Sequence, residues 1–362
     1  MERRSFLSKS AVGAGVGTAA LGFPAIVRAQ PAVRWRCSSG FPKALDTIYG
    51  AAEDAAKRIS DATGGRFQIS VAPAGEIVPM PQAADAVGAG TVECSHTAAF
   101  YYVGKDPTWA FGSCIPFGMN FRQMNAWWLE GGGEKLFNDF LRPQGMQYFL
   151  SGNTGAQMGG WFRKEIKTME DVRGLKMRIP GLGGRLFSAV GAVPQQIPGG
   201  DIYPALERGT IDAAEWVGPY DDEKLGFNKV APFYYYPGFW EGGAGLGWLV
   251  NNRSWDALTP EYRAIFRAAV KEANAGMMAR YDARNEPALR RLIAGGTKVT
   301  AFPRPVMEAF YRAALTMYQE IGATNANFKR HYDSYSANQR AAVQWMRFTE
   351  NTFDDFMAAM LR

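Results

Sequence analysis

The sequence contains two short corners in which a glutamate stands beside a tryptophan. In RGTIDAAEW the pair is Glu215-Trp216, and in FYYYPGFWEGG it is Trp240-Glu241. A single glutamate is usually a solvated surface charge. Two of them beside indole rings at the ends of strand-like segments favour a site where carboxylate oxygens meet a hard cation while the rings exclude water.

A second group of polar residues lies in SGNTGAQMGGWFRKEIKTMEDVRGLKMRIPG. Gln157 precedes the Gly-rich strand GGWFRK, and Arg178 lies between Met177 and Ile179 in a short strand. Alternation along the strand puts Arg178 on the face opposite both neighbours. An arginine in a cleft offers a planar fork of donors that matches a carboxylate. The alternative is a surface cation paired with an acid.

Several enzyme classes lack their usual signatures here. The chain after residue 29 has no GxSxG, P-loop, HExxH or GxGxxG motif with a following acid. There are two histidines, His96 and His331, which disfavours general acid–base chemistry and a His-rich zinc site. We interpret His96 as a packing residue. Cys37, Cys94 and Cys114 have no zinc-like spacing, and we expect them to be buried and unpaired.

The first 29 residues are typical of an export signal. Arg3-Arg4 precede a Gly/Ala-rich stretch that ends at VRAQ, so we expect a twin-arginine type of signal cleaved after Ala29. Pro24 interrupts the stretch, which argues against the alternative of a membrane anchor. The segment carries +3 of the formal net charge of +6, and no dense Lys/Arg run follows. We therefore predict a periplasmic protein that binds no nucleic acid.

The order of elements indicates an α/β protein. The strand VRWRCSS, a helix over about 43–63 and the strand RFQISVA give a βαβ unit. Further strands are expected at MQYFLSG, GGWFRK, GLKMRIP, VPQQIP, DAAEWV and AGLGWLVNN. After Pro260 a long helix-favouring run extends to about residue 295, followed by the strand TKVTAF and another helix.

Two segments of the sequence align without gaps. AVGAGTVECSH (Ala86–His96) matches ALERGTIDAAE (Ala205–Glu215) as helix, Gly-Thr turn and strand. Chance is one explanation, since such junctions are common. A true repeat would mean two similarly wound lobes, with His96 and Glu215 at equivalent strand ends beside a common cleft.

The signature MEDVRGLKMRIP, the segment RGTIDAAEWV, the export signal and the order of elements resemble solute-binding proteins of tripartite ATP-independent periplasmic (TRAP) transporters. The resemblance covers essentially the whole chain after the signal. It implies a two-lobed periplasmic-binding-protein fold with a long connecting helix and an extra C-terminal helix. The implied lobes are 30–153 completed by about 243–283, and 154–242 completed by about 284–335, with the C-terminal helix at 336–362.

The resemblance also implies a ligand and its contacts. Arg178 corresponds to the arginine that clamps a substrate carboxylate in this family. Gln157, Glu215-Trp216 and Trp240-Glu241 together look like the branch that binds 2-oxo or 2-hydroxy monocarboxylates with a metal cation. The expected substrate contacts are Arg178, Gln157, Trp216, Glu241, Asn153, Phe100 and Tyr101, with Tyr102 in the same wall. The expected cation ligands are Gln157 Oε1, the Glu215 carboxylate, the Trp216 backbone carbonyl and Glu241.

The charge of such a site requires a cation. Glu215, Glu241 and a bound acid would contribute −3, against +1 from Arg178, and buried unpaired charge is costly. A divalent ion would neutralise the site, which favours calcium. The resemblance admits sodium, which we favour slightly, with calcium as the alternative.

The resulting hypothesis is a receptor and not an enzyme. A pyruvate-like acid and a cation would bind, the lobes would close, and a membrane permease would recognise the closed form. The alternatives are a sugar acid, polyol or aromatic acid as ligand, or a metal-assisted enzyme acting on 2-oxo acids. The tail from Ser336 carries an apolar stripe that must be buried. It would pack either on its own domain or on a second copy in a homodimer.

Overall fold

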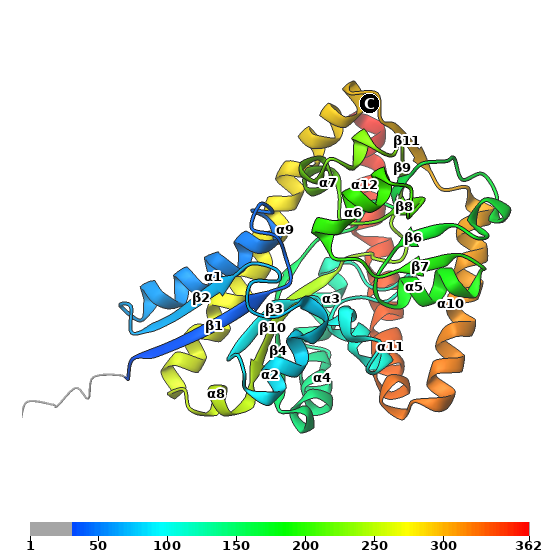
Figure 1. Ribbon diagram of the computed structural model, residues 1–362. Coiled ribbons are helices and arrows are strands. Elements are labelled where there is room, and N and C mark those ends of the chain that lie inside the picture. The colour runs from blue at the N-terminus through cyan, green and yellow to red at the C-terminus, as the bar shows by residue number, and fades with distance from the viewer. Residues whose placement is uncertain (1–30, 362) are drawn as a thin grey trace, which may run out of the picture. The chain divides into compact units, whose positions relative to one another are not determined.

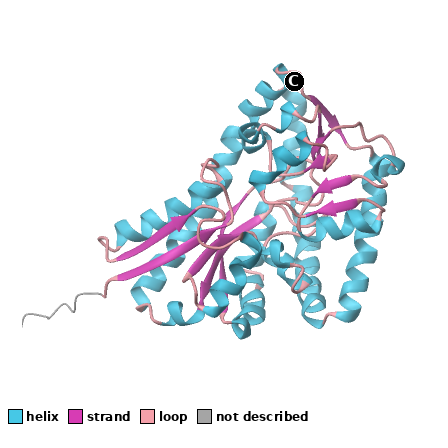
Figure 2. Cartoon of the chain, viewed as in Figure 1, coloured by secondary structure: helices cyan, strands magenta, loops and turns pink. Residues whose placement is uncertain are grey.

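The computed structural model describes residues 31–361, so the predicted export signal at 1–29 lies outside the described residues. From Ala32 onward the chain forms one compact unit. Its strands form two sheets with helices packed around them (Figures 1 and 2). The α/β class is confirmed, and the boundaries of the two lobes remain a prediction. No helix among residues 31–361 is both long and apolar enough to span a membrane.

The first sheet has the strand order β2-β1-β3-β10-β4. Its strands are β1 (Val33–Ser39), β2 (Phe67–Ala72), β3 (Cys94–Thr97), β4 (Met146–Asn153) and β10 (Gly245–Asn251). The helices that lie between these strands in the chain are α1 (Ile48–Ala62), α2 (Ala83–Ala89), α3 (Phe121–Leu129) and α4 (Gly133–Leu141). Helix α1 begins five residues later than predicted, because residues 43–47 form turns. The three cysteines are free and buried, as expected.

The second sheet has the order β11-β9-β5-β8-β6-β7. Its strands are β5 (Gly160–Phe162), β6 (Lys176–Arg178), β7 (Val193–Gln195), β8 (Ala213–Ala214), β9 (Phe233–Tyr236) and β11 (Lys298–Ala301). The intervening helices are α5 (Gly181–Ala189), α6 (Gly199–Glu207) and α7 (Pro219–Leu225). These strands have two to four residues, compared with four to eight in the first sheet.

The two sheets share one pattern of pairing. In the first, β1 pairs parallel with β2 and β3, and β10 runs antiparallel between β3 and β4. In the second, β6 pairs parallel with β7 and β8, and β5 runs antiparallel between β8 and β9. Strands β3 and β8 therefore occupy equivalent positions, each after a short helix and a left-handed glycine, Gly90 or Gly209. This topology supports the sequence repeat.

The chain passes between the sheets three times: once through a long helix after β10, and twice through short crossing segments, 154–159 and 237–244. They are hydrogen-bonded to each other, since Gly238 N donates to Gln157 O (2.8 Å) and Gln157 N to Glu241 O (3.3 Å). After β10 come α8 (Asn252–Asp256) and α9 (Pro260–Ala294). Helix α9 has 35 residues, confirming the predicted long helix, and packs against α1, β4 and α7. The Thr259 hydroxyl caps it by accepting from Tyr262 N (3.2 Å).

The C-terminal region differs from the prediction of one helix over 336–362. After α10 (Arg304–Thr324), α11 runs over Ala326–Phe348 and a separate α12 over Glu350–Met360. Asn325 caps the start of α11, and non-helical dihedrals at Thr349 (φ −108°, ψ −90°) separate the two helices. Part of the apolar stripe packs on the chain itself, because Met346 is buried. The remainder, Trp345, Phe348, Phe353, Phe356, Met360 and Leu361, is 60–79% exposed.

Candidate functional site

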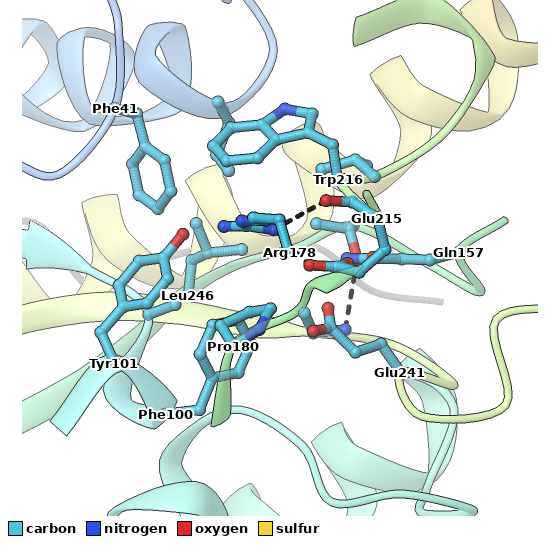
Figure 3. Close-up of a pocket in the computed structure, with 15 residues that line it drawn as sticks. Phe41, Phe100, Tyr101, Gln157, Arg178, Pro180, Glu215, Trp216, Glu241 and Leu246 are labelled. Carbon is cyan, nitrogen blue, oxygen red and sulfur yellow. Dashed lines mark hydrogen bonds and ion pairs between the residues drawn. The ribbon is translucent and has the colours of Figure 1, made fainter. Parts of the chain in front are cut away.

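A small cavity lies where residues of both halves and both crossing segments meet (Figure 3). Its volume of about 20 Å³ exceeds the roughly 10–15 Å³ that one water requires. One wall comes from the half built on the first sheet: Phe41, Ile48, Ala98, Phe100, Tyr101 and Leu246. The other wall is Arg178, Pro180, Glu215, Trp216 and Val217, and the crossing segments contribute Thr154, Gln157, Glu241 and Ala244.

Arg178 lies in this cavity because of its place at the end of β6. Met177 and Ile179 point into the core, and Arg178 faces the other way but is only 1% exposed. Its Nε donates to Ile197 O (3.0 Å) and its Nη1 to the backbone carbonyl of Glu215 (2.7 Å). Nη1 also forms a buried ion pair with the Glu215 side chain. The arginine therefore extends into the cavity with its guanidinium held in one orientation.

Two glutamates share the cavity with this single arginine. Glu215 follows β8, and its backbone N–H donates to Arg178 O (3.1 Å), while Glu241 comes from the crossing segment. Both are almost completely buried. Burial raises the pKa of each carboxyl, and Arg178 offsets this only in part. The neighbouring Glu215 further raises the pKa of Glu241. The protein alone therefore has an excess of acidic groups here.

Two oxygen atoms in the cavity have no hydrogen-bond partner. They are Gln157 Oε1 and Glu215 Oε2, both buried. Gln157 is held with this oxygen free because its Nε2 donates to Thr154 Oγ1 (3.0 Å). Amide and carboxylate oxygens are the ligands that Na⁺ and Ca²⁺ take, so the residues present fit a hard cation. No group of three or more His, Cys, Asp or Glu within 31–361 forms a metal cluster by itself, so amide and ligand oxygens would have to complete the shell.

The two tryptophans of the corner motifs have different environments. Trp216 lines the cavity, and the Arg178 guanidinium lies 5.0 Å from its ring centroid. Trp240 does not line it. Its ring packs in the core against Phe239 (4.6 Å between centroids) and Phe187 (5.1 Å). The expectation that both indoles lie at the site is therefore wrong for Trp240, whereas Trp216 lies in the cavity wall and its role there remains a prediction.

Of the remaining predicted aromatic and asparagine contacts, two line the cavity and two do not. Phe100 and Tyr101 line the cavity opposite Arg178 (Figure 3), whereas the Tyr102 hydroxyl contacts Met80 O (3.3 Å) and lies outside it. Asn153 is buried beside the cavity, where its Oδ1 accepts from Gly155 N (2.9 Å) and its Nδ2 donates to Gly243 O (3.3 Å). It joins the two crossing segments and is not among the lining residues.

His96 packs between aromatic rings, as expected. Its ring centroid lies 5.4 Å from that of Phe41 and 6.1 Å from that of Trp248. Burial lowers its pKa to about 3, so the imidazole is neutral. His96 does not line the cavity, although the equivalent residue Glu215 does. Sequence reasoning missed Phe41, Thr154, Pro180 and Leu246, whose residue types carry no chemical signal of their own.

Comparisons with known proteins agree with this geometry. The model of the family described as bacterial extracellular solute-binding protein, family 7, matches residues 38–325. A curated monocarboxylate 2-oxoacid-binding periplasmic protein of Nostoc sp. (strain PCC 7120) is 46% identical, over 99% of this chain and 100% of that protein.

Two crystal structures of TRAP solute-binding proteins are similar to the chain. One, from Bordetella bronchiseptica RB50, is a mixed-occupancy dimer with copurified calcium and picolinate in one active site and the other site apo. It is 50% identical with a TM-score of 0.90, covering 91% of this chain and 98% of that one. The other, from Pseudoalteromonas atlantica T6c, holds sodium and pyruvate. It is 35% identical with a TM-score of 0.87, covering 90% and 99%.

Proposed function

We propose, since the chain belongs to the family 7 bacterial extracellular solute-binding proteins of the TRAP type, that it captures a small 2-oxo monocarboxylate such as pyruvate together with a metal cation. The observation that carries the proposal is the pair of buried, unpartnered oxygens on Gln157 and Glu215 beside the buried Arg178 guanidinium. The cavity thus offers acceptors to a cation and, next to them, donors to a carboxylate.

The chemistry of a 2-oxo acid fits both sides. Its carboxylate and adjacent keto oxygen can chelate one hard ion. Picolinate, found in the Bordetella protein, has the same arrangement, with a ring nitrogen beside a carboxylate. We assign the cation to Gln157 Oε1, Glu215, Glu241 and the Trp216 backbone carbonyl, and the acid's carboxylate to Arg178. Phe100 and Tyr101 would limit the length of the acid.

The charge of the site and the ions found in similar proteins narrow the choice of cation to calcium and sodium. Two carboxylates, one arginine and one bound acid sum to −2, which a divalent ion neutralises. The Bordetella protein holds calcium and the Pseudoalteromonas protein holds sodium. We keep both ions, and the titration below distinguishes between them.

The partners follow from the transporter class. The twin-arginine-like signal would export the chain to the periplasm, where the closed, loaded form would be recognised by integral-membrane TRAP permease subunits.

We further propose a homodimer through α12, because the described part of this helix has no buried residue. A groove of about 670 Å³ between α10 and α11 exposes Tyr311, Leu315 and Val343, and a second copy would cover this apolar surface. That the Bordetella protein is a dimer supports self-association of this chain.

The test is a titration of the mature protein with C3–C6 2-oxo acids in sodium, in potassium and with a chelator. Pyruvate should bind only when sodium or calcium is present, and propionate, which lacks the keto oxygen, should bind at least about 100-fold more weakly. Glu215→Gln should weaken cation dependence, whereas the exposed Glu170→Gln should not.

Equal binding of pyruvate and propionate, or pyruvate binding without either ion, would refute the proposal. Selective binding of a sugar acid or polyol would favour the alternative ligand classes.

A further inference from the structure

The cavity volume of about 20 Å³ is little more than one water needs, so the two halves of the protein must separate to admit a ligand. Arg178 and Glu215 are at most 1% exposed, and the cavity wall opposite them consists of Phe100, Tyr101 and other residues of the first half. A hinge motion at the crossing segments would open it. Contacts between the halves that lie away from the hinge and outside the cavity would then break on opening and form again on closing. Such contacts contribute to ligand affinity without touching the ligand.

One buried polar contact of this kind joins the start of α1 to α7. Thr47, which precedes α1 in the first half, donates from Oγ1 to Asp221 Oδ1 (2.6 Å). The other oxygen of Asp221 accepts from the Tyr281 hydroxyl of α9 (2.6 Å). All three side chains are fully buried. Both carboxylate oxygens are therefore satisfied only while Thr47 is in place.

Helix α7 is firmly attached to the second half by the next residue. Asp222 Oδ2 accepts from Trp161 Nε1 (2.9 Å) in β5 and from the Tyr234 hydroxyl (2.8 Å) in β9. Its Oδ1 accepts from the backbone N–H groups of Val217 and Gly218, both at 3.2 Å. The two adjacent aspartates therefore have different roles. Asp222 fixes the turn after Trp216 to the second sheet, and Asp221 points from α7 toward the first half.

Surface charges surround this contact but are individually weak. Asp46 accepts from the Tyr220 hydroxyl (3.1 Å) and from Arg284 Nη1 (2.6 Å) and forms an ion pair with Lys224. Asp46 is about half exposed, and exposed ion pairs contribute little to stability because solvent screens them. Buried hydrogen bonds to a charged group contribute more, and a buried carboxylate left unsatisfied is costly. The Thr47–Asp221 contact is therefore the dominant polar link at this edge.

We propose that Thr47 and Asp221 are affinity-determining positioning residues, and that their hydrogen bond holds the closed state over the loaded cavity. This inference rests on the proposed function, because it requires a ligand that closes the protein. Neither residue touches the cavity's polar groups. Their effect should therefore appear in how long the ligand is retained and not in which acid or ion is chosen.

The experiment compares Thr47→Val with Thr63→Val in the mature protein, using pyruvate with calcium. Thr63 is the matched control: it is buried at the other end of α1 and bonds only within its own half, to Ile59 O (2.7 Å) and from Phe67 N (3.0 Å). Thr47→Val should raise the dissociation rate and Kd about 10-fold or more. Thr63→Val should lower Tm with Kd unchanged, and Thr47→Ser, which keeps the hydroxyl, should restore wild-type dissociation.

Two results would separate the possible failures. If Thr47→Val lowers Tm but keeps the wild-type dissociation rate and Kd, the contact is merely structural and this inference is wrong. If the wild-type protein itself binds no 2-oxo acid with calcium or sodium, the proposed function fails instead. Thr47→Val should also leave the preference for pyruvate over propionate unchanged, and a changed preference would contradict a role outside the cavity.

Discussion

Arg178 and Glu215 are bound to each other in the cavity: Nη1 of the arginine contacts both the backbone carbonyl (2.7 Å) and the carboxylate of the glutamate. Strand pairing enforces this proximity, because Arg178 lies opposite Ala214 in the β6–β8 register. A bound acid would accept from this same guanidinium, and a cation would pair with the same carboxylate. The bound acid would take the place of Glu215 beside Arg178, and the cation would take the place of Arg178 beside Glu215. This exchange explains why acid and cation are expected to bind together.

Arg178→Met should abolish binding of 2-oxo acids. The variant loses the charge-assisted donors to the carboxylate, so we expect Kd for pyruvate to rise at least about 100-fold. Glu215 can take up a proton once its partner is gone, so the protein should stay folded. Calorimetry and a thermal melt check both points. Arg178→Lys keeps the charge without the fork and should bind weakly; retained micromolar affinity in Arg178→Met would remove the clamp hypothesis.

Stabilisation by the cation should increase with pH. Burial raises the pKa of Glu215 from 4.5 to about 8, so its contribution to stability is present below 4.5 and is lost as pH rises toward 8. Above that pH the Glu215 carboxyl is ionised, and a cation offsets the added negative charge. At lower pH protons compete with the ion. The Tm increase caused by 1 mM calcium should therefore be about 4 °C larger at pH 8.5 than at pH 6.

The control for this pH series is Glu215→Gln, in which the calcium effect should be smaller and depend less on pH. A calcium effect that is constant from pH 6 to 8.5 in the wild type would show that these carboxyls are not its ligands.

Trp216 should report ligand binding by fluorescence and Trp240 should not. Trp216 lines the cavity beside Arg178, whereas Trp240 lies in the core against Phe187 and Phe239. Trp216→Phe should remove most of the emission change on adding pyruvate and cation, and Trp240→Phe should preserve it. Calorimetry on both variants verifies that ligand still binds. A signal lost only in Trp240→Phe would contradict the placement of the two rings.

Removal of α12 should convert a dimer to a monomer. The cut belongs after Thr349 and not after Tyr335, because Met346 is buried farther along α11. Light scattering should show half the wild-type mass, with Kd for pyruvate within about 3-fold. In the full-length chain, Phe353→Glu with Phe356→Glu should have the same effect. A dimeric truncated protein, or a monomeric wild type, would refute this interface.

The sequence was informative where short-range patterns determine structure. Alternation around Arg178 correctly predicted a buried arginine facing away from two core residues, and the long run after Pro260 correctly predicted α9. Contacts between residues far apart in the sequence could not be predicted from such patterns. Nothing adjacent to Trp240 shows that its ring turns into the core, and Thr47 meets Asp221 from 174 positions away. Such contacts depend on how the sheets pack, which local periodicity does not encode.

The two crossing segments are hydrogen-bonded to each other and carry Gln157 and Glu241. In the proposed opening motion, atoms near the rotation axis would be displaced least. An amide and a carboxylate on these segments would then keep their spacing in the open and closed states. Selectivity for ion size would be set by this nearly stationary pair, while Phe100 and Tyr101 would approach the acid with the other half.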